Sequence, residues 1–220
     1  MALLAFDLDG VLYSSEPFLG DAYREAIEAV HARHPSAFAR VPTTHEILAH
    51  VGWTLPVIFA NLFPGVDPDA LTDLHASTLE VICRRVAGRE GVLYEGVPAV
   101  LRAVRADGHQ LAVASNGRAR YIESVLATYD LADLFLPRVT ADEVGDKVAI
   151  LRHYVNAVGV SPTRAVMIGD RASDVEAARA VGCPFIGCDY GHGHRDEIEA
   201  AGPLIQDFAA LPDTVAALLR

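Results

Sequence analysis

The chain has 220 residues, of which 51% are hydrophobic and 21% charged, a composition typical of a folded globular protein. Its 29 acidic and 18 basic side chains give a net charge of −11, which argues against a general binder of nucleic acid or anionic lipid. No apolar run reaches the roughly 18 residues of a membrane span, and no signal-peptide pattern is visible. We expect a cytoplasmic protein, a monomer or homodimer, that meets neither nucleic acid nor membrane.

Short apolar runs that alternate with helical patterns predict a parallel sheet. Runs of this kind are typical of strands that are buried on both faces. They cover residues 3–8, 110–115, 164–169 and 184–188, with a weaker one at 134–136. Helical patterns cover residues 97–107, 118–129, 147–158 and 172–181. The alternation predicts an α/β fold with a Rossmann-like, doubly wound sheet.

Residues 16–91 interrupt this alternation with helical patterns alone. One helix is expected over 17–34, another begins after Thr43, and two more cover 55–63 and 69–86. Glu46 follows Thr43 by three residues, which is the pattern of a capping box. The sequence therefore predicts a core of residues 1–15 and 92–220 and an inserted four-helix domain of residues 16–91.

Polar side chains follow the predicted strands, at the edge where open α/β sheets form their sites. Asp7 and Asp9 follow the first strand, Ser115 and Asn116 the second, and Asp170 the run at 164–169, with Asp174 four residues later. Carboxylates gathered in this way repel one another unless a cation joins them. Carboxylate oxygens suit Mg²⁺, so we expect a magnesium site.

Lys147 is the one lysine among the 18 basic residues, and it opens the predicted helix 147–158. Its ammonium and the Ser115 hydroxyl are groups that can hold an anion. Each residue also has an ordinary structural explanation by itself: Asp9-Gly10 as a turn, Ser115 as a helix cap, Asp174 as a first-turn carboxylate. Their joint position at neighbouring strand ends favours a functional site.

These segments together resemble the four motifs of the haloacid dehalogenase-like (HAD) hydrolase superfamily. Asp7-Leu8-Asp9-Gly10-Val11 resembles the first motif, Ser115-Asn116 the second, Lys147 the third and the segment Gly169 to Asp174 the fourth. The helical insertion is similar to the C1 cap of that superfamily. Gly96-Val97-Pro98 and the segment Asp174 to Gly182 are phosphoglycolate phosphatase-like. Relatives often carry Lys-Pro at the third motif, whereas Val148 follows Lys147 here.

The resemblance implies a phosphatase that works through an aspartyl-phosphate. Asp7 is then the nucleophile and Asp9 the general acid and base. Ser115, Asn116 and Lys147 hold the phosphoryl group. Mg²⁺ is bound by Asp7, the carbonyl of Asp9 and Asp170, with Asp174 acting through a ligand water.

A small-molecule phosphate ester is the expected substrate, with phosphoglycolate the first candidate by resemblance. A phosphomutase of the β-phosphoglucomutase type stays open, because it uses the same core. A non-enzymatic phospho-acceptor module is a further alternative, but such modules are shorter and lack a helical insertion after the first strand.

The insertion holds the candidates for substrate selection. Gly52-Trp53-Thr54-Leu55 resembles the substrate-specificity loop of the cap, although Trp53 could equally pack in the core of the helices. Five arginines could meet a substrate carboxylate: Arg24, Arg40, Arg84, Arg85 and Arg89. His192-Gly193-His194 is interpreted as a glycine-rich loop and not as a second metal site.

Overall fold

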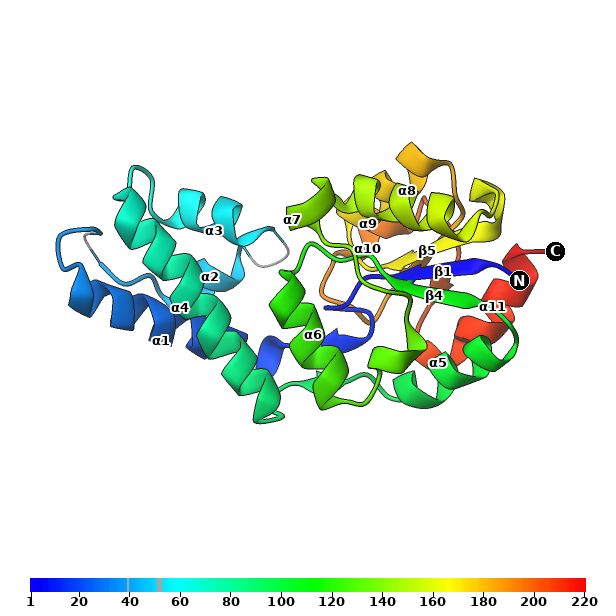
Figure 1. The fold of residues 1–220 in the computed structure, drawn as a ribbon, viewed down its shortest axis with the longest axis horizontal. Helices are drawn as coiled ribbons and strands as arrows, with labels where there is room; N and C mark the ends of the chain where they lie inside the picture. The colour runs from blue at the N-terminus through cyan, green and yellow to red at the C-terminus, as the bar shows by residue number, and fades with distance from the viewer. Residues whose placement is uncertain (39, 51–52) are drawn as a thin grey trace. The chain divides into compact units, whose positions relative to one another are not determined.

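The computed structural model describes residues 1–38, 40–50 and 53–220, and its chain forms two compact units (Figure 1). The first unit comprises Met1–Ser14, Val92–Ala119 and Tyr129–Arg220. The second comprises Ser15–Gly91 and Arg120–Thr128. Within the described ranges, no helix is both long enough and apolar enough to cross a membrane.

A parallel sheet with strand order β4-β1-β5-β6-β7 forms the centre of the first unit. Its strands are β1 (Leu3–Phe6), β4 (Gln110–Val113), β5 (Ala165–Gly169), β6 (Phe185–Cys188) and β7 (Leu204–Ile205). Leu3 of β1 lies opposite Gln110 on one side and Ala165 on the other. The α/β fold with a doubly wound parallel sheet is thus confirmed.

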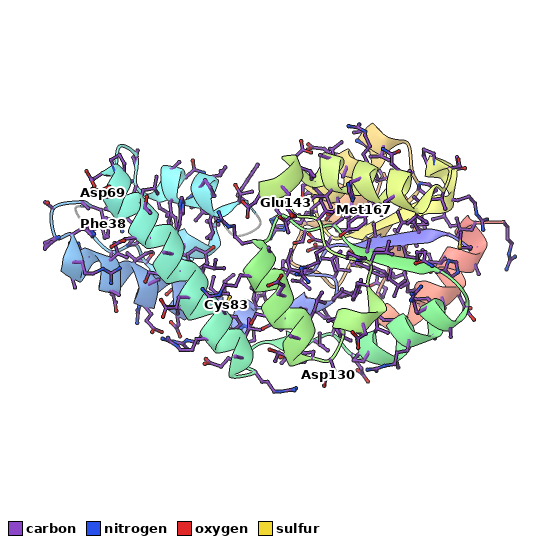
Figure 2. All side chains as sticks on the ribbon, in the orientation of Figure 1. Phe38, Asp69, Cys83, Asp130, Glu143 and Met167 are labelled. Atoms are coloured by element: carbon purple, nitrogen blue, oxygen red, sulfur yellow. The ribbon has the colours of Figure 1, made fainter. Side chains whose placement is uncertain are left out.

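Helices cover both faces of this sheet (Figure 1). One face packs on α8 (Lys147–Val158) and α9 (Ala172–Val181), through a core that includes Leu3, Ala5 and Met167, the last labelled in Figure 2. Phe6, whose side chain alternates with that of Ala5, contacts the ring of Phe208 instead, at 6.1 Å between centroids. On that side lie α5 (Val97–Ala106) and α11 (Leu211–Leu218).

Shorter elements complete the first unit. They are the helices α7 (Ala141–Val144) and α10 (Arg195–Ile198) and the 3₁₀ turns η1 (Ala132–Leu134), η2 (Pro162–Arg164) and η3 (Phe208–Ala210). The expected strand at 134–136 is wrong, since Leu134 ends η1. The amides of Leu134 and Phe135 donate back to Leu131 and Ala132, so the local turn uses the groups that a strand would need. Leu136 alone reaches β4, donating to the Leu111 carbonyl at 2.8 Å.

The sequence did not predict three strands of two residues each, namely β2 (Tyr13–Ser14), β3 (Val92–Leu93) and β7. β2 and β3 pair antiparallel, and Tyr94 N donates to the Leu12 carbonyl at 3.1 Å beside them. Two residues are too few to show an alternation of apolar and polar side chains.

The second unit is helical, and its described residues contain no strand. Its helices are α1 (Glu16–Arg33), α2 (Thr44–Leu48), α3 (Leu55–Leu62) and α4 (Pro68–Ala87). Thr43 and Glu46 form the expected capping box at α2, with Thr43 N donating to Glu46 Oε2 at 2.8 Å.

Helix α6 (Ala119–Thr128) packs with these helices, although the sequence division at 91/92 grouped it with the sheet. Its contacts explain the difference. Ser124 Oγ donates to the Cys83 carbonyl of α4 at 3.4 Å, and Arg89 donates to the Thr128 carbonyl at 2.7 Å. Cys83 is labelled in Figure 2. It is a free thiol, as are Cys183 and Cys188.

Candidate active site

Asp7 lies just beyond the carboxyl end of β1, the strand between β4 and β5. Its amide donates to the Ile168 carbonyl of β5 at 2.9 Å, while Ala114 N donates to the Phe6 carbonyl at 2.8 Å. These bonds fix the backbone of Asp7 between the ends of β5 and β4. The residue is 9% exposed, and its Oδ1 accepts a hydrogen bond from Leu8 N at 2.7 Å. A carboxylate is thereby held in one orientation where three strands end.

Lys147 reaches this carboxylate from the first turn of α8. Asp146 caps that helix, with its Oδ1 accepting from Ala149 N at 2.7 Å. Lys147 is 4% exposed, and its Nζ donates to Asp7 Oδ2 at 2.7 Å and to Asp174 Oδ1 at 2.6 Å. Burial disfavours the ammonium, but the two carboxylates outweigh burial and raise the pKa of Lys147. The lysine therefore stays charged and balances the two acids.

Asp174 uses both of its carboxylate oxygens within the protein. Oδ1 accepts from Lys147, and Oδ2 accepts from the amides of Asp170 at 3.1 Å and Arg171 at 3.0 Å. Burial raises the pKa of Asp174, and the charge of Lys147 opposes that rise. The first turn of α9 is thus tied to the end of β5 and to the lysine.

Asp170 follows β5 and is bonded on one side only. Its Oδ2 accepts from His192 N at 2.8 Å and from Gly193 N at 3.1 Å. Its Oδ1 is buried and has no hydrogen-bond partner among the described residues. Burial, with the nearby charge of Asp7, raises the pKa of Asp170 to about 6.

This arrangement fits a Mg²⁺ ion. Asp7, Asp170 and Asp174 each offer an oxygen within 4.8 Å of the others. Burying Asp170 Oδ1 without a hydrogen-bond partner costs free energy unless a cation or a donor binds it. Mg²⁺ prefers hard oxygen ligands and is commonly held by one or two carboxylates. Asp170 suits direct ligation through its free Oδ1, whereas both oxygens of Asp7 and both oxygens of Asp174 already accept hydrogen bonds.

The other residues expected at the site lie on the following turns. Ser115 is buried just beyond β4, where its Oγ accepts from Gly117 N at 3.2 Å, and Asn116 lies half-buried next to it. Asp9 is half-buried in the turn after β1, which closes through Leu12 N and Tyr13 N donating to the Leu8 carbonyl. The contacts in the structure join Asp7, Lys147, Asp170 and Asp174. The structure shows where these residues lie, and the catalytic and binding roles of all of them, Asp9, Ser115 and Asn116 included, remain predictions.

Trp53 is 64% exposed, so it does not pack in the core of the helical unit. The alternative that this single tryptophan has a packing role in the helical core is therefore excluded. Its neighbour Gly52, part of the expected specificity loop, lies outside the described residues.

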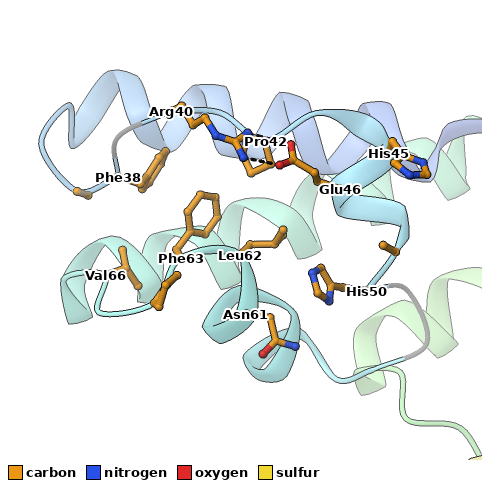
Figure 3. A pocket seen from close by; sticks show the side chains of 13 residues that line it. Phe38, Arg40, Pro42, His45, Glu46, His50, Asn61, Leu62, Phe63 and Val66 are labelled. Carbon is orange, nitrogen blue, oxygen red and sulfur yellow. Dashed lines mark hydrogen bonds and ion pairs between the residues drawn. The ribbon is translucent and has the colours of Figure 1, made fainter.

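The candidate arginines of the helical unit all have partners. Arg24 pairs with Glu28, Arg40 with Glu46, and Arg84 and Arg85 with Glu25, while Arg89 bonds the Thr128 carbonyl. A cavity of about 680 Å³ in this unit is lined by Phe38, Phe63, His50, Asn61 and the Arg40–Glu46 pair, among others (Figure 3). The ion pair neutralises the charge that an anionic ligand would need there.

The glycine-rich loop at 191–193 is the part of the site that the sequence did not reveal. Its backbone amides, and not its histidine side chains, contact Asp170. A signal was present, because two glycines flank His192 and glycine allows close backbone approach. The pattern gave no indication of which residue the loop would approach.

Comparison with known proteins now defines the class. The model of the haloacid dehalogenase-like hydrolase family matches residues 1–182, and a related HAD-like hydrolase model matches residues 147–218. The chain belongs to the haloacid dehalogenase-like hydrolase family. Such a match favours an enzyme over a phospho-acceptor signalling module.

Individual relatives of the chain indicate which hydrolases of this family it resembles. The chain is 29% identical to the phosphoglycolate phosphatase of Vibrio vulnificus strain YJ016, over 99% of this chain and 94% of that protein. It is 30% identical to the phosphoglycolate phosphatase of Pseudomonas putida, over 95% of this chain and 78% of that protein. The fold is shared with the crystal structure of a predicted phosphoglycolate phosphatase from Haemophilus somnus, with a TM-score of 0.80, 20% identity and 97% coverage of both chains. The protein is a hydrolase of the phosphatase class, and over nearly its whole length it is similar to phosphoglycolate phosphatases.

Proposed function

We propose that the protein is a Mg²⁺-dependent phosphatase that hydrolyses a small phosphorylated metabolite through an aspartyl-phosphate on Asp7. Phosphoglycolate is the first candidate substrate, because curated relatives over nearly the whole chain carry that activity in their names. The observation that carries the proposal is the site itself. Asp7 directly follows β1, its carboxylate lies 2.7 Å from Lys147 Nζ, and the unpartnered oxygen of Asp170 belongs to the same cluster of carboxylates.

Asp7 is the nucleophile. One of its oxygens attacks phosphorus, and the bond between phosphorus and the ester oxygen breaks. Leu8 N and Lys147 Nζ each hold one oxygen of this carboxylate, at 2.7 Å in both cases. These two bonds fix the plane of the carboxylate, so the attacking oxygen does not have to be ordered when the substrate arrives.

Asp9 moves the proton in both steps. It gives a proton to the leaving alkoxide, and it then takes one from the water that attacks the aspartyl-phosphate. The second step releases inorganic phosphate and restores the Asp7 carboxylate. Asp9 lies two residues beyond Asp7 in the hydrogen-bonded turn that follows β1, so the two carboxylates have a fixed spacing along the chain.

Asp7, Asp170 and the carbonyl of Asp9 would hold Mg²⁺, and Asp174 supports the site through Lys147 and the amides of Asp170 and Arg171. The bound ion would offset the repulsion between the carboxylates and an incoming phosphate. Ser115, Asn116 and Lys147 stabilise the transferring phosphoryl oxygens. Trp53, exposed on the helical unit, contributes to the choice of substrate.

Phosphate release tests the proposal directly. Purified protein freed of metal with EDTA is assayed with phosphoglycolate, a panel of sugar phosphates and p-nitrophenyl phosphate, with and without added Mg²⁺. We expect release of inorganic phosphate only with Mg²⁺. Ca²⁺ should inhibit, because its looser and higher coordination misaligns Asp7.

The matched variants are Asp7→Asn, which removes the nucleophile, and Asp213→Asn, which makes the same change at an exposed position of α11. Asp7→Asn should have no detectable activity, and Asp213→Asn should match the wild type. Full activity in metal-free protein, or in Asp7→Asn, would contradict the proposal. Isomerisation of a sugar phosphate without phosphate release would identify a mutase instead.

A further inference from the structure

Three glycines lie against Asp170, two of them at its side chain and one at its backbone carbonyl. A Cβ atom built at Gly193 would lie 1.8 Å from the Asp170 carbonyl oxygen, and one at Gly191 would lie 2.4 Å from Asp170 Cβ. A Cβ at Gly10, in the turn after β1, would lie 2.2 Å from Asp170 Oδ2. Only residues without a side chain permit this approach. The sequence thus provides space for a backbone to contact this one acid.

The amides of the loop at 191–193 use that space asymmetrically. His192 N and Gly193 N both donate to Oδ2 of Asp170, at 2.8 and 3.1 Å, while Oδ1 keeps no partner among the described residues. Oδ2 therefore accepts two hydrogen bonds, whereas Oδ1 is buried and accepts none from the described residues. Rotation of the carboxylate would break both bonds.

The loop is anchored by the residue before it and by its own middle residue. Tyr190 Oη donates to the Val11 carbonyl at 2.9 Å, and His192 Nε2 lies 3.4 Å from Ser14 Oγ. Beyond the loop, Glu197 of α10 accepts from Ala172 N, the first residue of α9, at 2.9 Å. These contacts tie the loop to the segment after β1 and to the helix after Asp170, so its amides have a fixed place relative to the acid.

We propose that the loop Gly191–His192–Gly193 is a positioning element for the magnesium site, whose two amides fix Asp170 so that Oδ1 alone is presented to the ion. The inference rests on the proposed function, since it assigns the loop a role toward Mg²⁺. Groups that orient a metal ligand commonly change metal affinity by about 10- to 100-fold when they are lost. The loop acts through Asp170 and does not itself touch the reacting atoms.

Gly193→Ala tests the proposal, because its methyl group would displace the loop from Asp170. Gly202→Ala is the matched control, since a Cβ there would lie 2.1 Å from the Phe185 carbonyl oxygen, a comparable clash at a carbonyl away from Asp170. Two quantities are measured: the Mg²⁺ concentration for half-maximal hydrolysis, and Mn²⁺ binding without substrate by electron paramagnetic resonance. Gly193→Ala should weaken both by at least about tenfold, whereas Gly202→Ala should lower the melting temperature and leave both unchanged.

Equal metal affinity in Gly193→Ala and the wild type would overturn the inference, as would an equal loss in both variants. A wild-type protein that binds no metal would instead overturn the proposed function. Should Gly193→Ala not fold, hydrogen exchange of the 189–194 peptide replaces it. Exchange should accelerate in Asp170→Ala and not in Asp213→Ala, and unchanged exchange in Asp170→Ala contradicts the role of the amides.

Discussion

Replacing Lys147 by Met removes the charge that joins two buried acids while keeping a side chain of similar length. Lys147 Nζ lies 2.7 Å from Asp7 and 2.6 Å from Asp174, and oxygens of the two acids lie within 4.8 Å of each other. Two like charges at ~4.8 Å repel by about 3.5 kcal/mol when the effective dielectric constant is about 20. Loss of one partner from a buried ion pair costs about 3 to 5 kcal/mol. We expect Lys147→Met to lower the free energy of unfolding by that amount at pH 8.

The stability lost in Lys147→Met should become smaller as the pH falls. Burial already raises the pKa of Asp174 while Lys147 opposes the rise, so removing the lysine raises this pKa further. An acid whose pKa is higher in the folded than in the unfolded state holds its proton more tightly when folded. Stability is then greatest below the unfolded value, about 3.9, and decreases as the pH rises through the folded value. The deficit of Lys147→Met should therefore be smaller at pH 5 than at pH 8.

Urea unfolding followed by circular dichroism, in EDTA at pH 5 and pH 8, measures this difference. Arg152→Met is the control, because Arg152 is exposed on the same helix and donates only a long bond of 3.4 Å to the Ala180 carbonyl. Its effect should stay within about 0.5 kcal/mol at both pH values. A loss below about 1 kcal/mol for Lys147→Met at pH 8, or an equal loss at both pH values, would refute the reasoning.

Three further outcomes are expected. During turnover of p-nitrophenyl phosphate, whose leaving group needs little protonation, Asp9→Asn should accumulate phosphate on the Asp7 peptide and Asp7→Asn should accumulate none. Mass spectrometry after an acid quench distinguishes the two variants. Phosphate found on Asp9 would reverse the proposed roles. Reductive methylation, which can reach only Lys147 and the N-terminal amine, should impair hydrolysis unless phosphate and Mg²⁺ protect, and normal kcat/KM after complete methylation would place the lysine outside the site. In steady-state assays, Trp53→Ala should raise KM for phosphoglycolate and leave KM for p-nitrophenyl phosphate unchanged. An equal change in both KM values would show that Trp53 does not select the substrate.

The sheet and the acidic cluster were predictable because they depend on local patterns. Buried parallel strands give continuous apolar runs, and the topology then brings their carboxyl ends to one edge. Asp7 and Asp170 could thus be expected together, although 163 positions separate them along the chain. The single lysine pointed to the same place, and the structure puts its ammonium between Asp7 and Asp174.

The features that the sequence missed depend on the partners of backbone amides. The amides of His192 and Gly193 leave no trace in side-chain chemistry, so their bonds to Asp170 could not be foreseen. The strand predicted at 134–136 is wrong because the side-chain pattern there suggested a structure that the backbone does not form. Its three apolar side chains suggested a strand, but the amides of Leu134 and Phe135 are used in a local turn.

The packing of α6 has a consequence for attempts to exchange substrate preference between relatives by grafting. A transplant limited to residues 15–91 would leave behind the helix that bonds to Cys83 and Arg89. The graft would place α4 beside a foreign helix in place of α6. Residues 120–128 must travel with the insertion, so a successful chimera needs four junctions in the chain where the order of motifs suggests two.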